Sequence, residues 1–324
     1  MSHAIRFHAP GGPEVLRWEE VGVGETAPGE ARVRHHAVGL NYIDIYHRTG
    51  AYPLPMPSGI GLEAAGVVEA VGSAVTDLKV GDRVAYAGGP VGAYSEVRNM
   101  PADRLVKLPD AIDFETGAAM MLQGMTAQYL LRRTCKVEPG DTILIHAAAG
   151  GVGLIVCQWA RALGATVIGT VSSDEKAALA KAHGCDHAII YTRENFAERV
   201  RELTGGKGVR VVYDSIGKDT FTGSLECLRP LGMMVLFGAA SGPVPPFDLG
   251  LLAKMGSLFI TRPTLFTYIA QRSDLLAISG DLFDVVTSGK VKIEVNQTYA
   301  LKDAAQAQID LVARKTTGST VLLP

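Results

Sequence analysis

The sequence predicts an α/β protein in which a mostly β domain precedes a doubly wound parallel sheet. Three observations predict it: the length of 324 residues, short strand patterns before about residue 120, and alternating strand and helix patterns after about residue 140. At roughly 100–200 residues per domain, the length alone favours two domains.

The amino-acid composition further restricts the class of protein to which the chain can belong. Apolar residues make up 47% of the chain and charged residues 20%, which excludes wholesale disorder. The 31 Lys and Arg against 33 Asp and Glu leave a net charge of −2. A chain without basic excess has no electrostatic groove for nucleic acid, so we expect no nucleic-acid partner.

The cysteines and the chain start point to a cellular compartment. Cys135, Cys157, Cys185 and Cys227 form no CxxC pair and no dense framework, which favours a reducing, cytoplasmic environment. The first residues lack the apolar core of a signal peptide. Residues 142–160 carry no formal charge, but their glycines and changing period fit a strand, a turn and a helix better than a membrane span. We therefore expect no membrane association.

The first part of the chain reads as strands separated by turns. Strands are expected at Ala31–Val38, Ala64–Val71 and Val84–Ala87, because these runs are rich in small and β-branched residues and end at glycine-containing turns. Prolines at positions 53, 55 and 57 lie in a loop that cannot be helical. A compact, mostly β domain follows from this pattern.

The pattern changes near Phe114, where a helix-rich stretch over residues 115–133 begins. Strands and helices then alternate, which implies βαβ units and a parallel sheet. Their apolar runs lack strict alternation, as is typical of strands covered on both faces. The expected strands are 142–147, 166–171, 188–190, 209–213 and 233–237; the expected helices are 154–163, 175–183, 196–203 and 220–228.

The end of the chain, from about Thr264, shows two helical stretches and a closing strand, Thr320–Leu323. A terminal strand without a neighbour must pair elsewhere, and we expect it to return to the first domain. The predicted division is 1–122, 123–264 and 265–324, with the last segment belonging to the first domain.

The most informative segment is the glycine turn after the strand at 142–147. Ala147, Gly150 and Gly153 have the spacing of a dinucleotide-binding fingerprint, with Gly151 and Val152 between them. Such a turn lets the backbone approach a pyrophosphate, which then meets the N–H groups at the start of a helix. We expect a dinucleotide here; the alternative is a tight turn with a purely structural role.

The end of the next strand decides which dinucleotide binds. It ends in Ser172 and Ser173, where an NAD site usually offers an acidic residue, and Lys176 follows one turn into the helix. This favours NADPH over NADH. Asp174 and Glu175 oppose it, but the Ser172–Glu175 spacing fits a capping box, and Asp174 suits a helix N-terminus. Lys176 could also be an ordinary solvated lysine.

Several motifs together resemble the medium-chain dehydrogenase/reductase superfamily, and specifically its zinc-independent quinone oxidoreductases related to zeta-crystallin. The similarity extends over essentially the whole chain. The motifs that carry it are Gly61–Val68, Val71-Gly72, Gly81–Val84, Asn41–Asp44, Gly50–Pro53, Ala147–Gly153 and Gly318–Pro324. The resemblance implies a GroES-like mostly-β catalytic domain, a Rossmann cofactor domain inserted before a C-terminal return, and a homodimer.

The resemblance also bears on metal binding. Zinc-dependent relatives carry Cys where this chain has Asn41, and a His-Glu pair where it has Leu62-Glu63. Without those thiolate and imidazole ligands, tetrahedral zinc has no site, so we expect no metal. The remaining chemistry is direct hydride transfer from NADPH to an electrophilic acceptor, a quinone or another conjugated carbonyl.

The family pattern places Asn41, Tyr46 and Tyr52 around the substrate. An amide and two phenols can hydrogen-bond the oxygens of the acceptor and stabilise a developing oxyanion. The alternatives are a turn-forming asparagine and tyrosines that pack with their hydroxyls at the surface.

Further residues match family positions close to the cofactor, and others gain a possible role from their place in the sheet. Asp214 and Ser215 end a parallel strand, where ligand crevices open, although they could equally cap the following turn. Gly238 could be an ordinary turn glycine. The family matches are Thr126, Lys176, Tyr191, Phe237, Gly238 and Arg314.

Two further features resemble functional motifs, a histidine pair and a glycine-rich loop, but we expect neither to form a binding site. His35 and His36 lie on an expected strand without partners at ligand spacing, and we expect surface histidines. Gly205–Gly208 resembles a phosphate-binding loop, but its spacing fails. Two alternative functions stay open: reduction of an alkenal or enone double bond with the same cofactor, and a non-catalytic NADPH-binding structural or RNA-binding role.

Overall fold

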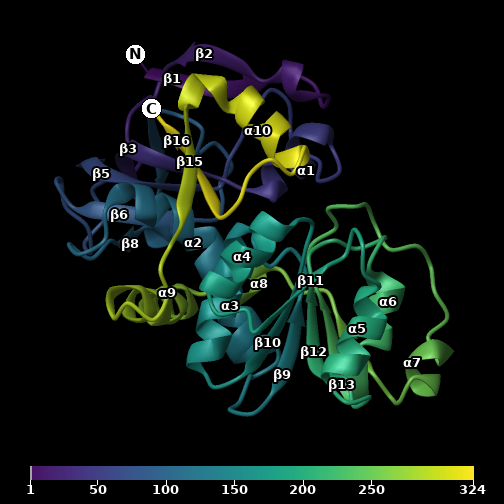
Figure 1. Ribbon diagram of the computed structural model, residues 1–324. Helices are drawn as coiled ribbons and strands as arrows, with labels where there is room; N and C mark the ends of the chain where they lie inside the picture. Colours follow the sequence, from purple (N-terminus) through teal and green to yellow (C-terminus); the bar gives the residue numbers. More distant parts are fainter. Residues whose placement is uncertain (1) are drawn as a thin grey trace. The chain divides into compact units, whose positions relative to one another are not determined.

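The computed structural model describes residues 2–324, which form two compact units (Figure 1). The first unit comprises residues up to 125 together with 269–287 and 293–324. The second comprises 126–268 and 288–292. Each unit has its own sheet system and its own apolar core.

The first unit is built on two sheets. A small antiparallel sheet has the order β2-β1-β4, and a larger one has the order β15-β16-β3-β5-β6-β8, with β7 also paired to β3. The strands are β1 (Ser2–Phe7), β2 (Arg17–Val21), β3 (Glu30–Leu40), β4 (Ser58–Gly59), β5 (Glu63–Val71), β6 (Arg83–Ala87), β7 (Val97–Pro101), β8 (Val106–Lys107), β15 (Val295–Ala300) and β16 (Ser319–Leu323).

The C-terminal strand completes the larger sheet. β16 pairs antiparallel with β3, with Val321 opposite Gly39, and β15 pairs parallel with β16. In Figure 1 these yellow strands lie beside purple β3, although almost the whole chain separates them in sequence. The expected return of the last strand to the first domain is confirmed.

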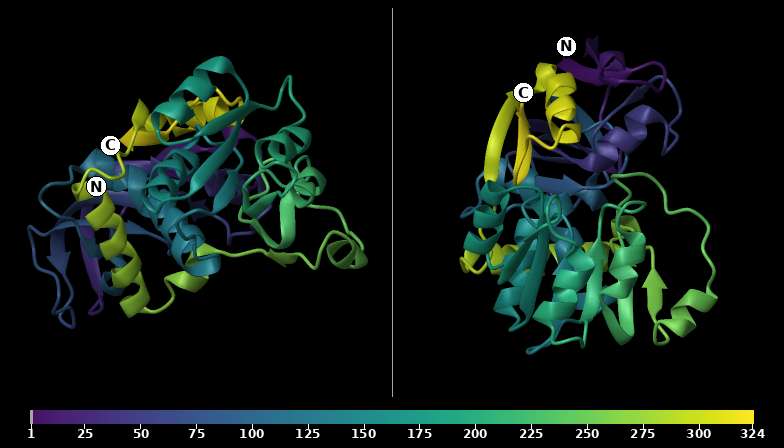
Figure 2. Two further views of the ribbon diagram at one scale, coloured as in Figure 1. Left: turned by 60° about the horizontal axis from the view of Figure 1, so that its bottom comes forward. Right: turned by 45° about the vertical axis from the view of Figure 1, so that its right-hand side comes forward.

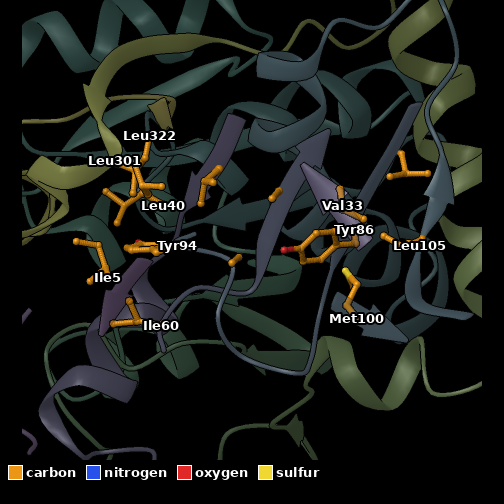
Figure 3. Packing of buried hydrophobic residues seen from close by; sticks show 14 of the residues in the cluster. Ile5, Val33, Leu40, Ile60, Tyr86, Tyr94, Met100, Leu105, Leu301 and Leu322 are labelled. Carbon is orange, nitrogen blue, oxygen red and sulfur yellow. The ribbon is translucent and has the colours of Figure 1, made fainter. Parts of the chain in front are cut away.

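The core of this unit contains buried side chains from both sheets and from the C-terminal segment. Figure 3 shows Tyr94 on the side of Ile5 and Leu322, and Tyr86 on the side of Met100 and Leu105. Both phenols are fully buried. Buried phenol hydroxyls need partners, and these are Asp44 for Tyr94 at 2.8 Å and a histidine for Tyr86 at 3.0 Å.

Helices cover parts of these sheets. They are α1 (Tyr42–Thr49), α2 (Phe114–Tyr129, which continues into the second unit), α9 (Arg272–Thr287) and α10 (Ala304–Val312), with 3₁₀ turns at Pro13–Val15, Ala102–Arg104 and Leu301–Asp303. The right-hand view of Figure 2 shows α10 close to the N-terminal strands, consistent with its packing on Pro13–Val15.

The second unit is a six-stranded parallel sheet of order β11-β10-β9-β12-β13-β14. Its elements are β9 (Thr142–Ile145), α3 (Gly151–Ala162), β10 (Thr166–Val171), α4 (Asp174–Ala182), β11 (His187–Ile190), α5 (Phe196–Leu203), β12 (Val209–Asp214), α6 (Phe221–Glu226), β13 (Leu228–Leu236), α7 (Gly250–Lys254), β14 (Phe259–Thr261) and α8 (Leu265–Tyr268). One turn of π-helix, Leu130–Thr134, follows α2.

The helices of this sheet form two pairs. α3 packs beside α4, and α5 beside α6, as right-handed crossovers on either side of β9 require (Figure 1). The strand order reverses between β9 and β12, and the carboxyl ends of parallel strands open a ligand crevice at such a switch point. The predicted doubly wound sheet is therefore confirmed.

Three local expectations are wrong. Helix α1 was not expected; Asn41 precedes it in extended geometry, and the Asp44 carboxylate accepts the Asn41 backbone N–H at 2.9 Å. The helix α4 N-cap is Ser173, which accepts the Lys176 N–H, so the predicted Ser172–Glu175 capping box does not form.

The third correction concerns His35, which was expected at the surface. It is 3% exposed, and its ring is hydrogen-bonded to the Ser95 carbonyl and the Tyr86 hydroxyl. Burial lowers the pKa of His35 to about 3, so the ring is neutral. His36 is exposed, as expected, and stacks on Phe114.

In residues 2–324, no helix combines the length and the apolar character needed to cross a lipid bilayer.

Candidate active site

The glycine turn joins β9 to α3 at the switch point of the sheet. Gly150 is the N-cap of α3, so Gly151, Val152 and Gly153 form its first turn. N–H groups in a first turn have no acceptor within the helix and are available to an anion. A Cβ on Gly153 would lie 2.3 Å from the Ala147 carbonyl oxygen. Only glycine therefore allows α3 to approach the turn this closely.

Ala147 occupies the first fingerprint position with a left-handed backbone, φ = 55°. This conformation costs an L-residue roughly 1–2 kcal/mol, whereas glycine adopts it freely. The structure thus explains why glycine is the usual residue at this position and shows that alanine is accommodated with strain. Neighbouring Ala148 has no such backbone; its N–H donates to the Thr170 carbonyl at 3.0 Å.

A buried polar network lies directly behind the turn. The two ring nitrogens of His146 lie 2.9 Å from the hydroxyls of Thr170 and Ser224. The Ser224 hydroxyl donates to Asp214, which also accepts the Thr220 hydroxyl at 2.6 Å. Burial lowers the pKa of His146, although the charge of Asp214 acts in the opposite direction. The network joins the ends of β9, β10 and β12 and rigidifies the edge on which the turn lies.

The ends of β10 and β11 lie side by side. The Tyr191 N–H donates to the Val171 carbonyl at 3.1 Å, so Tyr191 and the residues after Val171 share one edge. Tyr191 is 38% exposed. Ser172, Ser173 and Lys176 follow β10 directly, so four predicted cofactor residues are brought together at this edge.

Asp174, one of the two acidic residues that oppose NADPH, is paired with Arg193. The guanidinium donates to both carboxylate oxygens, at 2.9 and 2.5 Å. Hydrogen bonding from Arg193 lowers the pKa of Asp174, so the pair is ionised and internally neutral. Glu175 keeps a carboxylate beside the serines, where hydrogen bonding from Ser173 lowers its pKa, and Lys176 supplies a positive charge at the same helix start.

The ends of β12 and β13 also meet closely. Phe237 and Gly238 both donate their N–H to the Asp214 carbonyl, at 2.8 and 3.3 Å. A Cβ on Gly238 would lie 2.5 Å from the Ser215 carbonyl oxygen, so Gly238 permits a close approach. The Asp214 side chain accepts the N–H groups of Ile216 and Gly217 and caps the turn. The capping alternative therefore holds for Asp214.

The remaining predicted residue of the second unit, Thr126, is buried on α2. Arg314 lies in the first unit, exposed, with a left-handed backbone at φ = 59°. Its charge acts on Tyr42: burial raises the pKa of Tyr42, and Arg314 opposes that shift. Arg314 is therefore close to α1.

Three tyrosine rings gather on and after α1. The ring centroids of Tyr42 and Tyr46 are 5.4 Å apart, and those of Tyr46 and Tyr52 are 5.1 Å apart. The Tyr52 N–H donates to the Tyr46 carbonyl at 3.0 Å, which holds the two residues together. Tyr52 is 40% exposed, and Tyr46 is half-buried.

Asn41, immediately before α1, is 5% exposed. Its side-chain Nδ2 donates to Glu63 at 2.6 Å, and its Oδ1 accepts from Gln123 at 3.3 Å. Both ends of the amide are therefore held. Asn41, Tyr46 and Tyr52 are thus brought together by the short segment that contains α1.

Among residues 2–324, no three His, Cys, Asp or Glu side chains are grouped so as to hold a metal ion.

A doubly wound sheet with a glycine turn at its switch point, attached to a mostly β unit with a polar and phenolic cluster, defines a dinucleotide-dependent oxidoreductase of the medium-chain type. The comparisons with known proteins agree. The Alcohol dehydrogenase GroES-like domain family matches residues 27–110, and the Zinc-binding dehydrogenase family matches residues 151–277.

Full-length relatives define the family more narrowly. A quinone oxidoreductase of Pseudomonas aeruginosa is 57% identical over 100% of both chains, and a 2-haloacrylate reductase of a Burkholderia species is 52% identical over 100% of this chain and 99% of the relative. The crystal structure of Escherichia coli quinone oxidoreductase complexed with NADPH has a TM-score of 0.98 at 50% identity, covering 99% of this chain and 100% of that one. The chain belongs to the quinone oxidoreductase family of the medium-chain dehydrogenase/reductase superfamily.

Sequence reasoning missed several site residues. His146 and Ser224 are far apart in sequence and carry no motif. Arg193 carries no signal because its partner, Asp174, belongs to a different element. Gln123 and Glu63, which hold Asn41, are joined to it only by folding. A search for polar residues at the ends of predicted strands could have found His146.

Replacing Ala147 tests the strain in the turn. We expect Ala147→Gly to raise the free energy of unfolding by roughly 0.5–1 kcal/mol, because glycine removes the left-handed penalty. The matched control is Ala148→Gly, which we expect to lower it by roughly 1 kcal/mol, because Ala148 is buried and has an ordinary backbone. Denaturant titration measures both; equal destabilisation by the two variants would contradict the strain.

Proposed function

We propose that this protein is an NADPH:quinone oxidoreductase, which reduces quinones by hydride transfer from the nicotinamide without a metal. The observation that carries the proposal is the glycine turn on the first helix of a doubly wound sheet, in a chain whose full-length relatives are named quinone oxidoreductases. When bound, NADPH supplies the hydride, and the protein supplies position and polarity.

The residues of the second unit fit a dinucleotide phosphate. The N–H groups of Gly151, Val152 and Gly153 would bind the pyrophosphate, because first-turn N–H groups have no acceptor within the helix. Lys176, Ser172, Ser173 and Tyr191 would surround the adenosine ribose and its 2′-phosphate. The Arg193–Asp174 pair neutralises one of the two acidic residues that would repel this phosphate. Ser215, Phe237, Gly238, Thr126 and Arg314 are proposed to contact the nicotinamide side.

The first unit would bind the acceptor. The amide of Asn41 and the hydroxyls of Tyr46 and Tyr52 are proposed to hydrogen-bond quinone oxygens and to stabilise negative charge that develops on them. A half-exposed phenol such as Tyr52 can also pass a proton from solvent to the reduced oxygen.

A second candidate function is reduction of an activated carbon–carbon double bond. A relative 52% identical over the full chain is named a 2-haloacrylate reductase, which favours this alternative within the same site. Hydride addition to a conjugated double bond needs the same cofactor and the same stabilisation of a developing oxyanion.

Substrate comparison tests the proposal directly. We expect NADPH oxidation by the purified protein to show the highest kcat/KM with a benzoquinone, compared with an alkenal and 2-chloroacrylate. Strong turnover of either alkene with negligible quinone reduction would contradict quinone reduction. Tight NADPH binding without oxidation by any acceptor would instead favour the third alternative, a non-catalytic protein.

Replacing Lys176 tests the cofactor assignment. We expect Lys176→Ala to weaken NADPH binding roughly 10- to 100-fold, because a charge-assisted hydrogen bond to phosphate contributes about 1.5–3 kcal/mol. NADH binding should change little, since NADH lacks the 2′-phosphate. Lys181→Ala, at an exposed lysine of the same helix, is the matched control. Calorimetric titration with both nucleotides measures the effect, and unchanged NADPH affinity would overturn the assignment.

The proposal includes a homodimer in the cytoplasm. Four free cysteines support a reducing compartment.

β14 is an edge strand of the six-stranded sheet, and Phe259 on it is 54% exposed. Leu231 and Leu249 add further exposed apolar surface in the second unit, at 67% and 68%. Exposed edges with apolar side chains favour pairing with a second copy.

A charged side chain placed on β14 should dissociate the proposed dimer. We expect Phe259→Lys to sediment as a monomer at concentrations where the wild type sediments as a dimer, because lysine on an edge strand opposes pairing. Leu276→Lys, at an exposed apolar position on α9, is the control and should remain dimeric. A wild-type monomer in analytical ultracentrifugation would refute the homodimer.

A further inference from the structure

Four buried polar side chains of the first unit form one hydrogen-bonded chain, here named the amide chain. They come from four separate elements: the first residue of β5, the residue before α1, helix α2 and the first residue of β16. Each is less than 9% exposed. Its members, in order, are Glu63, Asn41, Gln123 and Ser319, joined by contacts of 2.6, 3.3 and 2.8 Å.

Both ends of the amide chain are defined by backbone groups. The second carboxyl oxygen of Glu63 accepts the Leu122 N–H at 2.7 Å. At the other end, the Ser319 hydroxyl lies 2.8 Å from Gln123 Oε1 and 3.0 Å from the Ala119 carbonyl oxygen. A hydroxyl has one hydrogen, so it can donate to only one of these two acceptors at a time.

With Glu63 ionised, every donor points towards its carboxylate. A carboxylate only accepts, so Asn41 must present its Nδ2 to Glu63 and its Oδ1 to the next member. Gln123 then donates from Nε2 to Asn41 and accepts at Oε1 from the Ser319 hydroxyl. In this direction the hydrogen bonds are those of the structure.

With Glu63 protonated, the same chain can run in the opposite direction. The carboxylic acid donates to Asn41 Oδ1, and a half-turn of each amide lets Asn41 donate to Gln123 and Gln123 donate to Ser319. The Ser319 hydroxyl then donates to the Ala119 carbonyl, which the structure already places at 3.0 Å. Amide oxygen and nitrogen have nearly the same size, so the half-turns need no repacking.

Because every link has a donor and an acceptor in both directions, we propose that Glu63 is a positioning residue: gain or loss of its proton reverses the amide chain and thereby turns the Asn41 amide. The inference rests on the proposed function only in taking Asn41 as a residue that binds the acceptor. The orientation of that amide decides where an N–H donor is available to a quinone oxygen.

The electrostatic surroundings of Glu63 place its titration near neutral pH. Burial raises the pKa of Glu63 to about 8; hydrogen bonds from Asn41 and Leu122 oppose the shift, and the charge of Asp44 adds to it. Asp44, on α1, is itself buried, which raises its pKa to about 7.

Two phenols also face Glu63. Tyr86 on β6 and Tyr94 in the loop before β7 each interact with its charge, and burial raises the pKa of both hydroxyls above the ordinary value. They stay neutral across the range in which Glu63 titrates. Glu63 is therefore protonated below about pH 8 and ionised above it.

Nuclear magnetic resonance of side-chain amides tests the reversal without relying on activity. On the full chain, labelled with ¹⁵N in Asn and Gln side chains, the Asn41→Asp and Gln123→Glu variants identify the two NH₂ signals. We expect both signals in the wild type to shift together with one midpoint as the pH rises from about 6 to about 10. Signals that do not move, or that move with separate midpoints, would overturn the proposal.

Two variants assign the titrating group. Glu63→Gln offers an NH₂ to Asn41 and an oxygen to Leu122, as protonated Glu63 would, so we expect no shift of the two signals with pH. Asp44→Asn should keep the titration, because Asp44 lies outside the amide chain and only affects its midpoint. A titration that persists in Glu63→Gln, or that disappears in Asp44→Asn alone, contradicts the role of Glu63. If Glu63→Gln does not fold, the wild-type and Asp44→Asn titrations still decide the matter.

Kinetics then connect the reversal to catalysis. We expect the pH profile of kcat/KM for a quinone to show an inflection at the midpoint of the amide signals, and this inflection should be absent from Glu63→Gln. An inflection retained in Glu63→Gln would refute the link to Asn41. If the two amide signals titrate together but the protein reduces no quinone, the proposed function is contradicted and the reversal of the amide chain stands. If the protein reduces quinones but the amide signals do not change with pH, the reversal is contradicted and the proposed function stands.

Discussion

The close approach of helix α3 to the turn after β9 is the constraint on which the cofactor site depends. Gly153 permits it, since any Cβ there would collide with the Ala147 carbonyl. The approach fixes where the first-turn N–H groups point, and the buried His146–Ser224–Asp214 network behind it holds the neighbouring strand ends in register. A fully satisfied polar network of this kind rigidifies its surroundings.

The first unit meets a different constraint, the burial of two carboxyl groups close to the proposed acceptor site. Within residues 2–324, amide, phenol and backbone donors hold Asp44 and Glu63, and none of these hydrogen bonds comes from a cation. Burial therefore raises the pKa of both groups towards neutral pH.

Much of the fold could be predicted from the sequence, because strand–helix alternation and the Ala147–Gly153 spacing are local patterns. The grouping of Ser172 and Lys176 at the end of β10 was also predictable, since both follow one strand. The burial of His35 and the pairing of Asp174 depended on contacts between distant segments, whereas helix α1 was missed although its Asn41–Asp44 cap is local. The burial of His35 requires β3 to pair with its neighbours, and the neutralisation of Asp174 requires Arg193 from beyond β11. No pattern within one element contains that information.

We propose that NADPH binds at the glycine turn, with its 2′-phosphate beside Lys176. A crystal structure of this protein grown with NADPH tests it most directly. We expect pyrophosphate oxygens within hydrogen-bond distance of the N–H groups of residues 151–153, and the 2′-phosphate in contact with Lys176 and Tyr191. A nucleotide bound away from this turn, or a 2′-phosphate that contacts no cation, would contradict it.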